Sequence, residues 1–209
     1  MCKLCEKNPV YEFTNQRKLC ARCFINYFQK KVLYIIRKFK MIRNNDVVVY
    51  ENKGNFRGVV LEDVLKMFAE KAMVDLVKLR SQARDIDKKL ITKNSSVNSS
   101  KKFRAKRGKS RIHKIAIPST IDTESDKLVH NLIKGNVKSL KELGPVNKNL
   151  VKPLYLFLDE EVLLYAKLRK LKFKKQKIEK DKISSFIDDL EIKHPEIKRA
   201  IINSYLELY

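Results

Sequence analysis

Four cysteines, all within the first 23 residues, are the side chains with the clearest capacity for chemistry. They form two C-x-x-C pairs, Cys2 with Cys5 and Cys20 with Cys23, separated by fourteen residues, and the chain has no other cysteine. Two thiolates three positions apart can turn inward from one tight turn, and two such turns supply the four soft ligands of a tetrahedral zinc site. Because four thiolates leave no open position for a substrate, we expect one structural zinc ion.

Two other states of these cysteines are two disulfides or four unrelated buried thiols. No signal peptide precedes Cys2, and intracellular chains seldom keep structural disulfides, so zinc is favoured. No run of 18 or more apolar residues exists, so nothing is expected to span a membrane. We therefore predict a cytoplasmic protein whose residues 1–24 form a zinc ribbon.

The charge of the chain indicates its partner. Lys and Arg total 47 against 24 Asp and Glu, giving a net charge of +23, which attracts phosphate backbones or anionic lipid surfaces. Nucleic acid is the favoured partner of the two.

Residues 13–45 hold nine Lys or Arg and no acid, and apolar residues recur there at helical spacing. This pattern predicts an amphipathic connecting helix within 25–45 that has a cationic outer side. A solvated face is the alternative. The candidate RNA-binding residues are Lys30, Lys31, Arg37, Lys38 and Lys40.

A second basic segment follows a polar tract at 92–100. Residues 101–111 place seven basic side chains around one aromatic residue, Phe103. Mutual repulsion and the lack of apolar spacing predict a mobile loop over 92–111 that orders when it binds RNA. The alternative is a nuclear-import-like or merely solvated insert. The candidate RNA-binding residues here are Lys101, Lys102, Arg104, Lys106, Arg107, Lys109 and Arg111.

The remaining pattern is that of an α/β protein. A β-branched run at 46–50 predicts a buried strand, and a polar loop at 51–58 separates it from a long helix expected over 59–91. A strand, a glycine-containing loop and a helix can together offer backbone N–H groups to a phosphate. Three histidines, His113, His130 and His194, are scattered and are expected to be structural. Further along, we expect a strand at 112–117 and helices at 123–135, 160–171, 183–190 and 196–208.

These motifs resemble those of one family. A ribbon that runs into a basic helix, then a strand and a loop, is similar to the start of the tRNA 2-thiouridine synthetases of the PP-loop ATP pyrophosphatase superfamily. The segment 131–145 (NLIKGNVKSLKELGP) resembles the family's N-x-L-R-G-D-x-x-R-L-x-x-L-G-P. A second family motif, I-K-P-L…E-x-E-V-x-x-Y-A…P-F, resembles residues 151–154 followed by Glu160 to Val162, Tyr165-Ala166 and Phe173. A third, L-E-x-x-H-P, resembles residues 190–195. The resemblance implies a reduced PP-loop α/β domain over 46–209.

The departures from the family concern the reaction itself. The family's phosphate-binding loop reads S-G-G-x-D-S, whereas residues 51–58 lack the serine and the paired glycines and begin with Glu51. Of the family's T-G-H-N-x-D-D, residues 117–123 retain one acid, Asp122. The family's catalytic cysteines have no counterparts after Cys23. The helix expected at 59–91 also runs where the family has a second strand, which suggests a trimmed sheet.

The resemblance and its departures together predict a function. The eukaryotic form of this system pairs a catalytic subunit with a degenerate partner, and we expect a zinc-containing, tRNA-binding subunit of the degenerate kind. It would have no catalytic or nucleotide-binding residues and would work with a catalytic subunit or as a homodimer. Two alternatives stay open: a divergent active thiolase completed by a partner chain, and a zinc-ribbon nucleic-acid adaptor.

Overall fold

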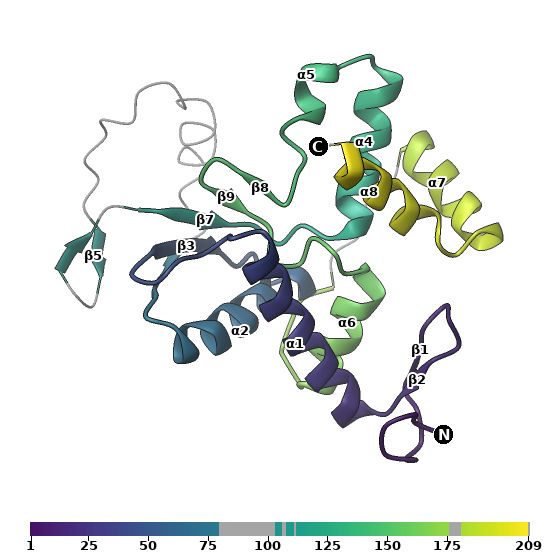
Figure 1. The fold of residues 1–209 in the computed structure, drawn as a ribbon, viewed down its shortest axis with the longest axis horizontal. Helices are drawn as coiled ribbons and strands as arrows, with labels where there is room; N and C mark the ends of the chain where they lie inside the picture. Colours follow the sequence, from purple (N-terminus) through teal and green to yellow (C-terminus); the bar gives the residue numbers. More distant parts are fainter. Residues whose placement is uncertain (80–102, 106–107, 111, 176–180, 209) are drawn as a thin grey trace.

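A computed structural model describes residues 1–79, 103–105, 108–110, 112–175 and 181–208, with the backbone alone at 103–105 and 108–110 (Figure 1). The strands are β1 (Tyr11–Glu12), β2 (Lys18–Leu19), β3 (Val47–Glu51), β4 (Asp75–Leu79), β5 (Phe103–Ala105), β6 (Gly108–Ser110), β7 (Lys114–Ala116), β8 (Val146–Asn147) and β9 (Leu150–Val151). The helices are α1 (Ala21–Lys38), α2 (Phe56–Lys71), α4 (Ile121–Ile133), α5 (Val137–Leu140), α6 (Asp159–Leu168), α7 (Lys182–Lys193) and α8 (Ile197–Leu208).

A mostly parallel sheet organises the molecule and confirms the expected α/β fold. Its strand order is β4-β3-β7-β9-β8, with β8 antiparallel to β9 and the other neighbours parallel. The interior strand β3 is buried along Val47–Tyr50, as expected when helices cover both faces of a parallel sheet. The chain leaves β3 for β4 on one side and later returns to β7 on the other. Ligands of such sheets bind beside this switch point, at the carboxyl ends of β3 and β7.

The main core lies between the sheet and a group of three helices, α1, α2 and α6. The apolar stripe of α1 is buried, and the ring of Phe28 lies 4.1 Å, centroid to centroid, from both Phe157 and Tyr165. The amphipathic helix expected within 25–45 is therefore present, although it begins at Ala21 and ends at Lys38. A second helical group, α4, α5, α7 and α8, packs beside it (Figure 1).

The prediction of one long helix over 59–91 is wrong. Helix α2 ends at Lys71, and β4 then pairs in parallel with β3 along five residues. The sheet therefore has the second strand that the sequence analysis took to be missing. The apolar residues of 74–79 fit a helical face by spacing, but pairing with the buried edge of β3 satisfies their backbone groups, and this contact is invisible to local periodicity. Residues 80–91 lie outside the described part.

The segment expected to be a mobile loop includes a paired hairpin. β5 and β6 are antiparallel, with Phe103 opposite Ser110 and Arg104 opposite Lys109. The sequence pattern did not indicate this pairing. The rest of 92–111 lies outside the described residues, so mobility there stays a prediction. Within the described ranges, no helix is both long enough and apolar enough to cross a membrane.

Candidate metal centre and closed phosphate loop

The four cysteine sulfurs converge at the N-terminal end of α1. All four Sγ atoms of Cys2, Cys5, Cys20 and Cys23 lie within 4.8 Å of one another. The Cys5–Cys20 and Cys5–Cys23 Sγ distances are 3.3 and 3.7 Å, far longer than a disulfide of about 2.05 Å. A tetrahedral ion with Zn–S bonds of about 2.3 Å separates its sulfurs by about 3.8 Å. The site therefore has the dimensions for one metal ion.

Local backbone structure positions each pair of thiols. The first knuckle is closed by hydrogen bonds from Cys2 N to Lys7 O (2.8 Å) and from Glu6 N to Cys2 O (2.9 Å), with Glu6 in the left-handed region at φ 59°. Cys20 is the N-cap of α1, so Cys23 lies in its first turn. The positive end of the helix dipole stabilises thiolates at these positions.

Electrostatics within the cluster favour a bound cation. Burial opposes the Cys2 thiolate, but backbone hydrogen bonds from Cys20 and Leu4 outweigh it and lower the Cys2 pKa to about 6. The sulfur of Cys20 in turn raises the pKa of Cys23 to about 12. Four thiols at this spacing cannot all ionise against one another, so full deprotonation requires a metal ion among them.

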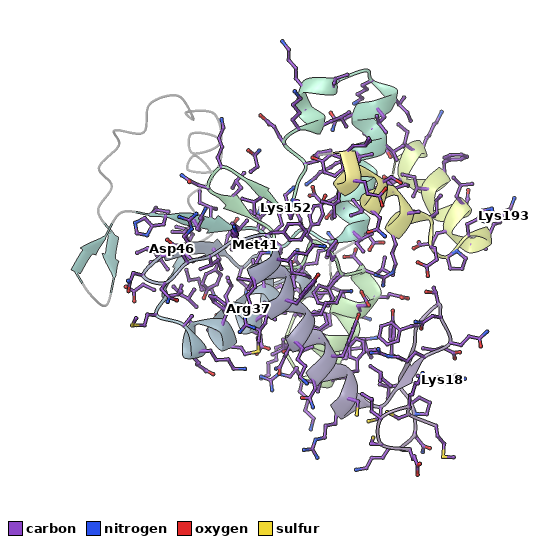
Figure 2. The ribbon with its side chains drawn as sticks, in the orientation of Figure 1. Lys18, Arg37, Met41, Asp46, Lys152 and Lys193 are labelled. Atoms are coloured by element: carbon purple, nitrogen blue, oxygen red, sulfur yellow. The ribbon has the colours of Figure 1, made fainter. Side chains whose placement is uncertain are left out.

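Four of the five candidate RNA-binding residues on α1 and just after it face solvent. Lys30, Arg37, Lys38 and Lys40 are exposed, and none of them pairs with a carboxylate in the described part of the chain. Figure 2 shows Arg37 on this helix. Lys38 lies over the ring of the exposed Tyr34, with its Nζ 5.8 Å from the centroid. These side chains form a cationic face, which we call the α1 face.

Lys31, the fifth candidate of this group, lies on α1 and points into the core. Its Nζ lies 4.4 Å from the centroid of the Phe157 ring and 3.8 Å from Oε2 of the buried Glu161. Burial lowers the pKa of Lys31 to about 8. A side chain held this way cannot reach a phosphate, so Lys31 is not part of the α1 face.

The candidates in the second basic segment are only partly placed. Arg104 and Lys109 lie opposite each other in the β5–β6 hairpin, where the backbone alone is described. The other five, Lys101, Lys102, Lys106, Arg107 and Arg111, lie outside the described residues.

The expected strand-loop-helix unit is present at β3 and α2, but its loop is closed. Asn55 caps α2 by accepting a 2.8 Å hydrogen bond from Gly58 N, and the Asn52 side chain accepts one of 2.8 Å from Gly54 N. A Cβ at Gly58 would lie 3.0 Å from both side-chain oxygens. Because the chain's own amides occupy these N–H groups, the loop does not offer them to a phosphate.

A polar network closes the same end of the sheet above the switch point. Arg57, in the first turn of α2, forms a bidentate pair with Asp159 of α6, one arm of which is a 2.7 Å bond from Nε. Thr120 Oγ1 donates to the same carboxylate at 2.8 Å. Asp122, the acid retained from the family motif, accepts from Asp159 N and from Lys198 Nζ. Sequence analysis missed the Arg57–Asp159 pair, because its partners are 102 residues apart.

The family-like residues of the second half build the core of this domain. Lys152 is buried and donates to Glu124 Oε2 at 2.6 Å, and Figure 2 shows it near the middle of the molecule. Tyr165 donates to Asp63 at 2.7 Å, and Glu161 accepts from Leu158 N at 2.9 Å. The roles of these residues in the structure are therefore packing and hydrogen bonding in the core, which support the fold and do not by themselves indicate a thiolation reaction.

Two of the histidines make structural contacts. His113 Nδ1 accepts a 3.1 Å hydrogen bond from Val47 N, next to the first residues of β3. His130 is held between Asp126 O and the carboxylate of Asp181. Neither histidine contacts a cysteine of the cluster in these hydrogen bonds, and both are far from the cysteines in sequence. This agrees with the structural role expected for them.

A cavity of about 450 Å³ is lined by residues of the β1–β2 turn and of the turn between α7 and α8. Aromatic rings of Phe13 and Tyr27 and the side chains of Asp122, Glu160 and Arg199 are on its wall. The carboxylates on this wall make the cavity less favourable for phosphate than the α1 face is.

Taken together, the sheet order, the strand-loop-helix unit and the four-cysteine site define a mostly parallel α/β domain preceded by a segment whose four cysteines could hold a metal ion. No family model matches the chain, and neither does any curated protein. Among solved structures, the U34-tRNA thiolase NcsA from Methanococcus maripaludis, described with its [4Fe-4S] cluster, is similar at a TM-score of 0.73. The match has 20% sequence identity and covers 99% of this chain and 86% of that one, which establishes the fold.

Proposed function

We propose that this chain is a non-catalytic, tRNA-binding component of a tRNA uridine 2-thiolation system. The observation that carries the proposal is a PP-loop-type domain whose phosphate loop is filled by Asn52 and Asn55 and overlaid by the Arg57–Asp159 pair. Support for tRNA as the ligand comes from the likeness to a tRNA thiolase and from the unpaired cations of the α1 face.

We further propose that the four-cysteine site holds one zinc ion. The similar thiolase contains a [4Fe-4S] cluster. Four irons and four sulfides occupy more space than one ion, so they hold cysteine sulfurs further apart than a single zinc does. Sulfurs that all lie within 4.8 Å fit the smaller group. Such a zinc has four protein ligands and would shape the N-terminal segment.

ATP binding separates this proposal from a divergent active thiolase. Isothermal titration of the purified chain with ATP and Mg²⁺ is expected to show no micromolar binding, because the N–H groups of Gly54 and Gly58 are already bonded to Asn52 and Asn55. The same titration, carried out with a catalytically active thiolase, serves as the positive control. Micromolar affinity, or thiolation of tRNA on adding sulfide to the chain alone, would establish the enzyme instead.

The cellular role is tested by mass spectrometry of tRNA nucleosides from cells that lack the protein. We expect thiolated uridine to fall and to return when the wild-type gene is restored. Unchanged thiolated uridine would favour the third function, a nucleic-acid adaptor outside tRNA modification.

A further inference from the structure

A strip of lysines follows α6 and belongs to neither basic segment described above. Six of the nine residues from 167 to 175 are Lys or Arg. Arg169 pairs with Asp63 at 3.2 Å. The other five are exposed, and within the described ranges none of them pairs with a carboxylate. We call these five the lysine strip: Lys167, Lys170, Lys172, Lys174 and Lys175.

The backbone of the strip is held in a defined course. Leu171 N donates to Ala166 O at 2.9 Å, which closes the end of α6 with Lys170 in the left-handed region at φ 54°. Leu171 and Phe173 then pack on the main core, and the Phe173 ring lies 6.4 Å from that of Phe56. Lys172 and Lys174 alternate with these half-buried residues along the chain and are exposed.

The strip contacts the closed phosphate loop through Lys174. Lys174 N donates to Gly54 O at 2.7 Å. The Lys174 Cδ atom is 3.9 Å from the position that a Cβ on Gly54 would take. The segment that fixes the loop from outside is therefore also the segment that carries the ammonium groups.

We propose that the lysine strip is a binding surface for the RNA phosphate backbone, built over the closed phosphate loop. The cations at this end of the sheet then contact phosphates of an RNA outside the domain rather than those of a nucleotide inside it. The inference rests on the proposed function in taking tRNA as the ligand, and it adds a contact surface separate from the α1 face.

The chemistry of the strip favours RNA over lipid. A row of ammonium groups suits a row of phosphates, and each such contact releases counterions. Leu171 and Phe173 turn inward, and residues 167–175 expose no large apolar side chain. A membrane-binding surface normally adds apolar insertion to charge, and the strip lacks that contribution.

The test compares two variants with equal loss of charge. The strip variant is Lys172→Gln, Lys174→Gln and Lys175→Gln. The control is Lys134→Gln, Lys138→Gln and Lys141→Gln, three exposed lysines in and around α5, which lies apart from α2 and α6 in Figure 1. Filter binding to tRNA is measured from 50 to 200 mM salt. Thermal unfolding and zinc content establish that each variant is folded.

We expect the strip variant to bind tRNA at least about tenfold more weakly at 100 mM salt, and the slope of log K against log salt to fall by roughly 2 to 3. The control is expected to change either quantity much less. Equal losses in both variants would mean that only total charge matters, and would overturn the inference.

Two further outcomes separate this inference from the proposed function. If Lys30→Gln, Arg37→Gln and Lys38→Gln together weaken binding while the strip variant matches its control, the strip inference is wrong and tRNA binding stands. If the wild-type chain binds anionic vesicles but not tRNA, both proposals are wrong.

Discussion

At the residue scale, burial decides what a charged side chain does in this molecule. Glu124 is fully buried and shares its carboxylate between two lysines, each within 2.8 Å. Lys152 is itself buried, whereas the Lys127 side chain is 50% exposed. The same acid therefore forms one buried and one exposed ion pair, and the two contacts differ mainly in solvent access.

Removing the two lysines should have unequal costs. Lys152→Ala leaves the buried Glu124 carboxylate with only the half-exposed Lys127 as its ion-pair partner, and is expected to lower the free energy of unfolding by about 3–5 kcal/mol. Lys127→Ala should cost under about 1 kcal/mol, because water screens that pair. Urea denaturation measures both. The double variant Glu124→Gln with Lys152→Met should recover much of the loss, and equal costs for the two alanine variants would contradict the assignment.

The Glu124 carboxylate also predicts a pH dependence. Burial alone would raise its pKa, but Lys152 and Lys127 outweigh burial and lower the pKa below the ordinary value of 4.5. A lowered folded-state pKa gives stability that is full above the unfolded-state value and is lost as pH falls through the folded-state value. Wild type should therefore lose more stability than Glu124→Gln between about pH 5 and pH 2. Parallel stability curves for the two proteins would refute this.

At the element scale, the N-terminal segment depends on the metal and on α1 together. Cys2, Leu19 and Cys20 belong to the same buried cluster as the apolar stripe of α1, and Tyr11 donates to Glu160 at 2.9 Å. A segment whose strands have two residues each is too short to hold a core of its own, so the metal and these contacts hold it.

Cys20→Ser should therefore loosen residues 1–24 and leave the α/β domain folded. Elemental analysis is expected to show one zinc per wild-type chain and much less in the variant. Hydrogen exchange should speed up in the N-terminal segment and stay slow in β3 and α2. Arg22→Ser, at an exposed position of α1, is the control and should keep its zinc. Iron in place of zinc in the wild type would contradict the metal assignment.

The end of α6 allows backbone strain to be separated from charge. Lys170 adopts a left-handed conformation that costs a side-chain-bearing residue about 1–2 kcal/mol. Lys170→Gly should relieve this strain and, after the entropic cost of glycine, stabilise the fold by about 0.5–1 kcal/mol. Lys170→Ala removes the same charge and keeps the strain. Both variants should reduce the salt slope of tRNA binding alike, but only the glycine variant should raise the melting temperature.

At the scale of the whole molecule, two cationic regions, the α1 face and the lysine strip, lie on a domain whose β3–α2 loop is closed by its own hydrogen bonds. These two regions are on different elements, and the basic segment 101–111 is a third group of cations in the sequence. A net charge of +23 attracts phosphates to the molecule as a whole without selecting one region. Specific binding therefore requires that particular regions contribute more than their charge alone.

Neutralising two regions together tests whether they bind separate parts of one tRNA. One set is Lys101, Lys102, Arg104, Lys106 and Arg107, and the other is Lys30, Arg37 and Lys38. Each lost phosphate contact should lower the salt slope by roughly 0.7 to 0.9, and the two sets should add in the combined variant. Unchanged affinity and slope in both sets would refute these surfaces. Equal binding to tRNA and to unstructured RNA would leave only a nonspecific cationic surface.

The sequence alone determined the features that depend on short-range pattern. Cysteine spacing placed four thiols at one point, because a C-x-x-C turn brings its two side chains together without help from the rest of the fold. Helical periodicity located α1, and the run at 46–50 located β3, because burial of one face or one strand leaves a local signature. Motif order in the second half led to the α/β fold.

The tertiary structure decided everything that depends on a distant partner. Residues 74–79 became a strand because β3 offers them a ladder, and Lys31 turned inward because Glu161 and Phe157 lie on α6 and in the segment before it. Asp159 reaches Arg57 across 102 residues, so no local pattern could predict that pair. Such contacts join groups that are far apart in the chain, and the Arg57–Asp159 pair that covers the phosphate loop is one of them.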